Sequence, residues 1–279
     1  MPRGLMSKDT FNLVLAELKA NVDLVRVVVL YHGGEPLLNK NFFWMCEAVR
    51  GVSPTLKLKT VTNGMALNER VVSKLVSCGL DSIEISLDGS SAGESEAIRS
   101  GSSTRQIIDG VKCLLNSRDG HSPNLAVVIS TTQFVKFQSR DQVFEDLIPT
   151  VPSWLIDEFG SRVDYNPTFG MKWPANFDYK DFDVIYGDGV DKNFCDHVNS
   201  TLTIRADGKV VACCYDLTSE LVMGDISHNS IVDIFNGSKY AELRKSIANR
   251  DYNSFCRECN VVRPPAYLVR KSRSSSNRL

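Results

Sequence analysis

The sequence predicts an α/β protein in which helices cover a parallel β-sheet. Segments rich in Val and Ile alternate with segments of helical spacing, in units of about 25 to 45 residues. The 279 residues are 43% hydrophobic and 23% charged, which is typical of a globular chain of one large or two modest domains. Five of the eight cysteines follow residue 194, so we expect a second region with different chemistry there.

The alternation can be followed along the chain. Ser7 is a candidate N-cap for a helix within residues 5–22, and VRVVVLY at 25–31 has the composition of a strand. Helices are expected next at 39–52, 68–79 and 104–117, and strands at 56–62, 81–87 and 124–131. The segments DQVFEDLIP (141–149) and WLIDEFGSRVDYNP (154–167) together are expected to add one more helix and strand pair.

Charge and hydropathy bound the class of partner. The net charge of -1 and the pI near 6.4 give no basic field, so no nucleic-acid partner is expected. No apolar run reaches the length of about 18 to 20 residues that a membrane span needs, and the first residues lack the apolar core of a signal peptide, so we expect a cytoplasmic protein that does not enter a membrane. Residues 263–279 are rich in Arg, Lys and Ser and are expected to form a flexible basic tail.

Three unusual motifs follow three successive strands: GGEP at 33–36, TNG at 62–64 and SLDG at 86–89. Each alone is an ordinary turn, but ligands of parallel sheets bind at the carboxyl ends of the strands, where these motifs gather. Glycines expose backbone groups, and Glu35 could accept hydrogen bonds from an ammonium group. Ser86 and Asp88 suit sugar hydroxyls, and Arg99 suits a carboxylate. The predicted ligand is an amino acid joined to a nucleoside.

This ordered set of motifs, with IRSG after SLDG, resembles the core of the radical S-adenosylmethionine (radical SAM) enzymes. The segments around FCDHVNSTLTIRADGKVVACCYDL and FCRECN are similar to the SPASM or twitch extension, which carries an auxiliary iron–sulfur cluster. The resemblance implies that backbone and carboxylate of the GGEP loop hold the methionine amine of S-adenosylmethionine. It implies nucleoside contacts from the TNG loop and the SLD strand, and a carboxylate contact from the arginine. The residues so implied are Gly33, Gly34, Glu35, Asn63, Ser86, Asp88 and Arg99.

Four cysteines are candidate ligands of a metal or cluster: Cys195, Cys213, Cys256 and Cys259. Four thiolates can hold zinc as well as an iron–sulfur cluster, and free thiols are a third alternative. The wide separation of Cys195 and Cys213 differs from the close pairs of zinc ribbons, and the resemblance implies a [4Fe-4S] cluster. Cys214 would point to the opposite face of a strand from Cys213. The other three, Cys46, Cys78 and Cys113, are expected to be core residues.

The chain departs from the family in one respect. Family members bind the cluster that cleaves S-adenosylmethionine through Cys-x3-Cys-x2-Cys after the first strand, and this sequence contains no such spacing. The resemblance thus implies a partial (β/α)6 barrel at 1–188 that lacks its first strand, followed by a small cysteine-rich SPASM/twitch domain at 189–262. We expect that the chain is a truncated product rather than a real protein that has lost the radical cluster, and that it is inactive as given.

For the full-length parent, the resemblance implies S-adenosylmethionine and a second [4Fe-4S] cluster. The implied reaction is reductive cleavage of S-adenosylmethionine to a 5′-deoxyadenosyl radical, which abstracts hydrogen from a peptide or small-molecule substrate. An electron donor such as flavodoxin or ferredoxin is an expected partner. The alternative function is a non-catalytic [4Fe-4S]-binding or electron-transfer module.

Overall fold

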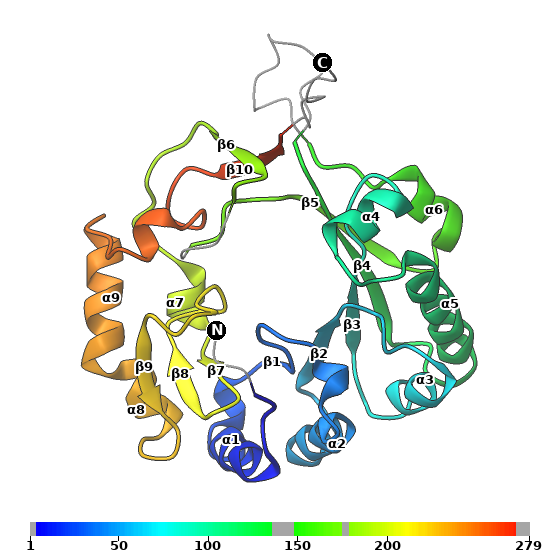
Figure 1. The fold of residues 1–279 in the computed structure, drawn as a ribbon. Coiled ribbons are helices and arrows are strands. Elements are labelled where there is room, and N and C mark those ends of the chain that lie inside the picture. The colour runs from blue at the N-terminus through cyan, green and yellow to red at the C-terminus, as the bar shows by residue number, and fades with distance from the viewer. Residues whose placement is uncertain (1–3, 136–147, 175–178, 272–279) are drawn as a thin grey trace, which may run out of the picture.

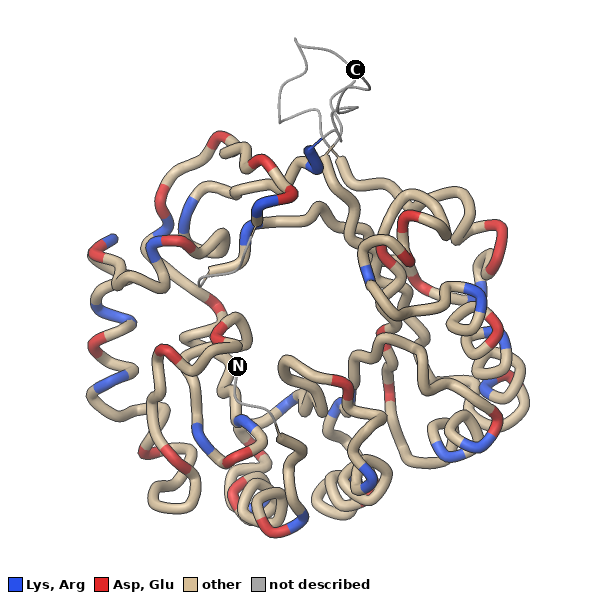
Figure 2. The backbone as a smooth tube through the Cα atoms, in the orientation of Figure 1, with Lys and Arg blue, Asp and Glu red and all other residues tan. Residues whose placement is uncertain are grey.

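The computed structural model describes residues 4–135, 148–174 and 179–271. Of the two segments expected to form one more helix and strand pair, residues 141–147 fall outside the described residues. Figure 1 shows the elements arranged as an incomplete ring, with the helices of the first half on the outside of a curved sheet and the second half completing the arc. Acidic and basic residues are interspersed around this ring, as Figure 2 shows.

The helices and strands alternate in the first half, as the sequence predicts. The helices in the described residues are α1 (Lys8–Ala20), α2 (Phe42–Val52), α3 (Glu69–Leu75), α4 (Ala92–Ile98), α5 (Thr104–His121), α6 (Ser153–Phe159), α7 (Asp196–Ser200), α8 (Ile231–Asn236) and α9 (Ser238–Ala248). The strands are β1 (Val27–Val29), β2 (Lys57–Thr62), β3 (Ser82–Ser86), β4 (Ala126–Gln133), β5 (Asp164–Phe169), β6 (Phe182–Tyr186), β7 (Thr203–Ile204), β8 (Lys209–Val211), β9 (Val222–Asp225) and β10 (Ala266–Arg270). Short 3₁₀ turns occur at Val22–Leu24, Pro36–Leu38 and Cys256–Glu258.

The central sheet is parallel, with five strands in the order β1-β2-β3-β4-β5. The predicted fold class is therefore confirmed. In the described part of the chain β1 pairs with β2 alone, and its Val27 and Val29 side chains are 46% and 48% exposed. Within the described residues, β1 is therefore an edge strand with exposed apolar side chains.

Side-chain alternation divides the sheet into two faces. On β3, Ile83 and Ile85 are fully buried against the helices. The side chains between and beside them, among them Glu84 and Ser86, lie on the opposite, inner face. Full burial of each isoleucine contributes about 1.5–3 kcal/mol, so this register is strongly specified.

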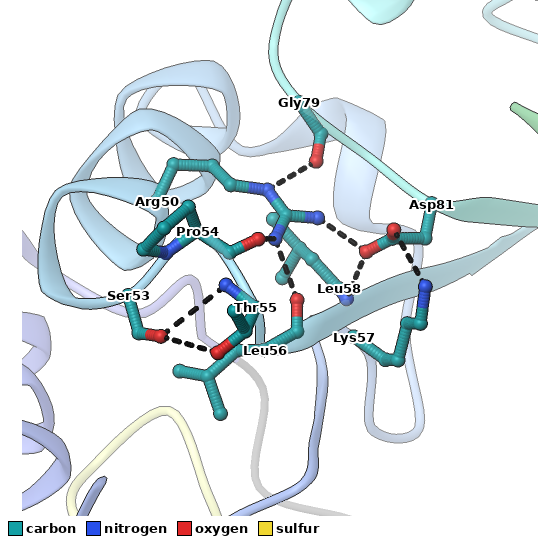
Figure 3. Close-up of polar contacts among 9 residues, drawn as sticks. All are labelled: Arg50, Ser53, Pro54, Thr55, Leu56, Lys57, Leu58, Gly79 and Asp81. Atoms are coloured by element: carbon teal, nitrogen blue, oxygen red, sulfur yellow. Dashed lines mark hydrogen bonds and ion pairs between the residues drawn. The ribbon is translucent and has the colours of Figure 1, made fainter. Parts of the chain in front are cut away.

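The amino ends of the strands are joined by a polar network around Arg50, at the end of α2 (Figure 3). Its guanidinium donates to the carbonyls of Gly79 (2.5 Å), Pro54 (3.2 Å) and Leu56 (2.5 Å), and it pairs with Asp81. Asp81 also accepts from the Leu58 amide at 2.7 Å. The α2–β2 and α3–β3 loops are thereby fixed to one another.

The second half has its own core around an antiparallel sheet, β7-β8-β9, covered by α8 and α9. Tyr240 of α9 is fully buried, and its hydroxyl donates to the Val211 carbonyl at 3.1 Å. No helix within the described ranges is both long and apolar enough to span a bilayer.

The flexible tail expected from residue 263 is wrong for residues 266–270. These residues form β10, which pairs antiparallel with β6 and buries Ala266 and Leu268. The composition of the segment concealed this because its pairing partner lies about 80 residues earlier, and a strand's hydrogen bonds do not depend on side-chain polarity.

Candidate functional site

The GGEP motif lies directly after β1, as predicted. Gly33 has φ = +63°, a conformation that favours glycine, and a Cβ on Gly34 would meet nothing within 4 Å. Glu35 caps the 3₁₀ turn that follows, because its Oε1 accepts from the Leu37 amide at 3.1 Å. The loop therefore presents the backbone of two glycines beside open space, while its acidic residue turns back into the protein.

Glu35 connects the first two strand ends. Its Oε1 accepts from the Thr62 hydroxyl at 2.7 Å, and its Oε2 accepts from the Asn63 amide at 2.8 Å. With the Leu37 contact, three of roughly four acceptor positions of the carboxylate are filled. Its geometry is therefore that of a residue that fixes the GGEP loop against the TNG loop.

Asp88 and Arg99 form the third strand end. Asp88 is 6% exposed; its Oδ1 accepts from the Thr132 amide at 2.9 Å, and its Oδ2 accepts from Arg99 Nε at 2.7 Å. The terminal nitrogens of Arg99 make no hydrogen bond within the described ranges, and one third of its side chain is exposed. Asp88 thus orients a guanidinium whose two outer donors stay available.

Ser86 and Asn63 differ in how they are held. Asn63 Oδ1 accepts from the Met65 amide at 2.9 Å, which stabilises the TNG turn. The Ser86 hydroxyl has no hydrogen-bond partner among the residues that the structure describes, and it lies half-buried on the inner face. Of the seven residues implied for S-adenosylmethionine, the structure gathers all at the carboxyl ends of β1, β2 and β3.

The inner face also carries a polar chain that we did not predict. Asn166 Nδ2 donates to the Ser130 hydroxyl at 3.2 Å, which donates to Glu84 Oε1 at 2.6 Å. The three residues come from β5, β4 and β3. The alternation that places Ser86 on the inner face also places Glu84 there, so the SIEIS pattern contained this signal.

Tyr31 lies in the loop after β1, within electrostatic reach of several of these groups. Burial raises the pKa of its phenol, Arg99 opposes that rise, and the charges of Glu35, Glu84 and Cys214 add to it. A single phenol therefore senses groups from the strand ends and from the second half of the chain. His32 makes a second link, since its Nε2 lies 3.2 Å from the Cys214 carbonyl oxygen.

The four candidate ligand cysteines, Cys195, Cys213, Cys256 and Cys259, are all buried in the second core. Burial, followed by the charges of Cys259 and Cys195, raises the pKa of Cys256 to about 12. The pKa of Cys259 is raised by burial and by the charges of Cys195 and Cys214, and that of Cys213 by burial and by the charges of Cys214, Cys259 and Cys195. The thiols thus lie within electrostatic reach of one another although they come from three separate segments.

Within the described residues, no three His, Cys, Asp or Glu side chains lie close enough together to hold one metal ion. Four cysteine thiolates suit an iron–sulfur cluster as well as zinc. Cys214 differs from these four in being half-buried, and its Sγ is 3.8 Å from His197 Nδ1. Cys46 and Cys78 lie in the first core, where a hydrogen bond between the two thiols, together with burial, raises the pKa of Cys46.

Comparison with known proteins matches two separate parts of the chain to family models. Residues 2–129 match the radical SAM superfamily, and residues 195–260 match SPASM, described as an iron–sulfur cluster-binding domain. The GTP 3′,8-cyclase of Lactiplantibacillus plantarum is 25% identical over 238 residues, covering 76% of this chain and 70% of that protein. The GTP 3′,8-cyclase of Listeria monocytogenes serotype 4b is also 25% identical, with the same shares covered.

Solved structures share the fold. BtrN in complex with AdoMet and 2-DOIA has a TM-score of 0.57 at 17% identity, covering 93% of this chain and 82% of BtrN. The enzyme anSMEcpe with AdoMet and the Cp18Cys peptide has a TM-score of 0.56 at 11% identity, covering 94% of this chain and 81% of that one. The chain therefore contains a radical SAM domain match at residues 2–129 and a SPASM iron–sulfur cluster-binding domain match at residues 195–260.

Proposed function

We propose that the second half of this chain binds one [4Fe-4S] cluster through Cys195, Cys213, Cys256 and Cys259. The observation that carries the proposal is the convergence of four buried thiols, from three segments, in one apolar core. Buried thiols of raised pKa need a cation to become thiolates, so cluster assembly would release protons and stabilise this core.

We further propose that the carboxyl edge of the sheet binds S-adenosylmethionine. The backbone of Gly33 and Gly34 faces the amine, with Glu35 holding the loop in place. The outer nitrogens of Arg99, oriented by Asp88, take the carboxylate. Ser86 and the Asn63 turn face the nucleoside. Glu35 and Asp88 are thus positioning residues in this proposal, because their oxygens are already hydrogen-bonded within the protein.

The chemistry supplied by bound S-adenosylmethionine and a reduced [4Fe-4S] cluster is the generation of a 5′-deoxyadenosyl radical for hydrogen abstraction. Because the 279 residues contain no Cys-x3-Cys-x2-Cys spacing, we propose that the chain as given does not perform this step. The substrate class is a peptide or a small molecule, and both find support in the solved relatives, one of which holds a peptide and another 2-DOIA.

Anaerobic reconstitution of the chain with iron and sulfide tests the cluster. We expect about four irons and four sulfides per chain. The Cys256→Ser, Cys259→Ser double variant should lose the cluster, whereas Cys214→Ser, at a neighbouring thiol outside the ligand set, should keep it. Stoichiometric zinc without sulfide, or undiminished iron in the double variant, would contradict the proposal.

A gain-of-function experiment tests the S-adenosylmethionine site. A strand with a Cys-x3-Cys-x2-Cys loop is added before residue 1, and the product should hold two clusters and cleave S-adenosylmethionine to 5′-deoxyadenosine when reduced. Glu35→Ala combined with Arg99→Ala in the extended chain should lower that cleavage by a large factor.

The second candidate function is a cluster-binding or electron-transfer module. The missing three-cysteine spacing favours it. If the extended protein assembles both clusters and forms no 5′-deoxyadenosine, this module is the better description of the chain.

A further inference from the structure

The inner face of the parallel sheet carries a carboxylate, Glu84, to which the S-adenosylmethionine site gives no role. Glu84 lies on β3, two residues before Ser86 and on the same face of the sheet. Figure 1 shows β3, β4 and β5 on the inside of the ring, with α5 and α6 outside them. A strand advances about 3.3 Å per residue, so Glu84 lies roughly 7 Å along the strand from Ser86, away from the carboxyl edge.

Hydrogen bonds from two neighbouring strands hold one oxygen of Glu84 and leave the other available. The Ser130 hydroxyl donates to Glu84 Oε1 at 2.6 Å, and Asn166 Nδ2 donates to the Ser130 hydroxyl at 3.2 Å. Ser130 is the register partner of Ser86 on one side and of Asn166 on the other, so the pairing of the strands itself positions this chain. Glu84 Oε2 accepts no hydrogen bond from any residue that the structure describes.

The protein supplies no cation to Glu84. Its carboxylate forms no ion pair within residues 4–135, 148–174 and 179–271. Two basic side chains of this region are placed otherwise. Arg99 is engaged by Asp88. Lys59 of β2 lies opposite Ser82 rather than opposite Glu84. A half-buried carboxylate without a counter-charge is unfavourable, and a cationic ligand would compensate it.

The surroundings of Glu84 indicate the kind of cation. Its register partners are Val61 on β2 and Val128 on β4, and Asp164 of β5 lies opposite Val128. The exposed Asp164 side chain has no hydrogen bond or ion pair in the described part of the chain. Neighbouring strands are about 4.8 Å apart, so the backbone positions of the two acids are roughly 10 Å apart across Val128. An ammonium group on an apolar stem fits this arrangement, because the stem can contact valine while the nitrogen donates to Glu84.

We propose that Glu84 binds a primary ammonium group of the substrate and thereby selects amine-bearing substrates. The inference rests on the proposed function, because the substrate is the molecule from which hydrogen would be abstracted. With its ammonium at Glu84 Oε2, a substrate would extend past Ser130 and Asn166 toward Ser86 at the strand end, where S-adenosylmethionine is proposed to bind. The ammonium can belong to a lysine of a peptide or to a small amine.

The test measures the binding of small probes to the isotope-labelled chain by NMR titration. Nα-acetyl-lysine amide carries the ammonium on a peptide unit, and aminocyclohexanol carries it on a small ring. Nα-acetyl-norleucine amide and cyclohexanediol are their uncharged counterparts. An ammonium probe should bind about 10-fold or more tightly than its counterpart at low salt and shift the amide resonances of Glu84 and Ser130. Added salt should reduce that difference. Which of the two ammonium probes binds identifies the source of the amine.

Glu84→Gln removes the charge but keeps an acceptor for Ser130. It should lower the affinity for the ammonium probe about 10-fold or more and leave the unfolding midpoint unchanged. Asp164→Asn should lower the affinity only about twofold, because a charge roughly 10 Å away in water contributes little.

A matched control makes the same substitution elsewhere. Glu47 is exposed on α2, in the outer helical layer, and Glu47→Gln should leave the binding of every probe unaltered. The comparison of charged with uncharged probes is made in the unaltered chain, so it does not depend on the folding of any variant.

The outcomes distinguish this inference from the proposed function. Equal binding of the charged and uncharged probes would overturn the inference, and so would an affinity that Glu84→Gln leaves unchanged. If the chain extended with the three-cysteine loop forms 5′-deoxyadenosine but no ammonium probe is favoured, the proposed function stands and the inference fails. If an ammonium probe binds through Glu84 but that extended chain forms no 5′-deoxyadenosine, the proposed S-adenosylmethionine chemistry fails and the ammonium site remains.

Discussion

The two edges of the parallel sheet each contain an arginine paired with an aspartate, and the two pairs are used differently. At the amino edge, every nitrogen of the Arg50 guanidinium donates to a carbonyl or to Asp81. At the carboxyl edge, only Nε of Arg99 is engaged, with Asp88, and its outer nitrogens remain without a partner in the described residues. A saturated guanidinium fixes loops, whereas a guanidinium held by one nitrogen presents the others to a ligand.

An ion pair alone therefore does not mark a functional site. Each aspartate also accepts a hydrogen bond from a backbone amide, that of Leu58 at one edge and that of Thr132 at the other. The two edges differ in the number of guanidinium N–H donors that have no hydrogen-bond partner among the described residues.

The largest effect is expected from Arg50→Lys. Lysine retains the charge but cannot reproduce the planar fork, so two or more of the carbonyls of Gly79, Pro54 and Leu56 lose their partner. We expect the free energy of unfolding to fall by about 2–3 kcal/mol. Urea denaturation measures it, and a loss below about 0.5 kcal/mol would remove the structural role assigned to this edge.

A smaller loss is expected from Glu35→Gln. One carboxylate oxygen becomes an NH₂ group, which cannot accept a hydrogen bond. The Thr62 hydroxyl and the Asn63 amide then no longer have one acceptor oxygen each. The free energy of unfolding should fall by about 1–2 kcal/mol. The Asn63 amide should also exchange with solvent faster, which hydrogen exchange can detect. Unchanged exchange at the TNG turn would show that Glu35 does not hold that loop.

The pH dependence of the amino edge is a third test. Burial opposes ionisation of Asp81, but the Leu58 amide and the Arg50 guanidinium outweigh it, so the pKa of Asp81 lies below its usual 3.8. A lowered folded-state pKa stabilises the protein above the unfolded value, and this contribution is lost as pH falls through the folded value. The stability difference between the natural chain and Asp81→Asn should therefore be full at neutral pH and shrink below pH 3.8. An equal difference at both ends of that range would contradict the assignment.

The smallest effect on stability is expected from Arg99→Lys. A lysine can keep the ion pair with Asp88, so unfolding should change by no more than about 0.5 kcal/mol. In the chain extended with the three-cysteine loop, however, the affinity for S-adenosylmethionine should fall about tenfold, because the two outer nitrogens are gone. Arg50→Lys should lower the stability but leave the affinity of the folded molecules for S-adenosylmethionine unchanged. Calorimetry measures both quantities, and the opposite pattern would contradict the roles assigned to the two edges.

The sequence by itself determined the elements and the ordering of the motifs. Val and Ile periodicity located the parallel strands, and Ser7 marked the start of α1, where its side chain accepts from the Thr10 amide at 3.0 Å. The placing of GGEP, TNG and SLDG at strand ends, and the choice of four cysteines, needed only local pattern and spacing. These features depend on neighbours in the chain, which a sequence displays.

Which polar atoms keep an unused hydrogen-bonding position could be seen only in the tertiary structure. Glu35 was expected to face a ligand; in the fold its oxygens also accept hydrogen bonds from Thr62 and Asn63, which lie 27 and 28 residues later. The partners of Asp88 and the pairing of β10 with β6 are likewise set by contacts between distant segments. A side chain's type gives its hydrogen-bonding capacity, but how much of that capacity is left for a ligand depends on which groups the fold brings within 3 Å or so of it.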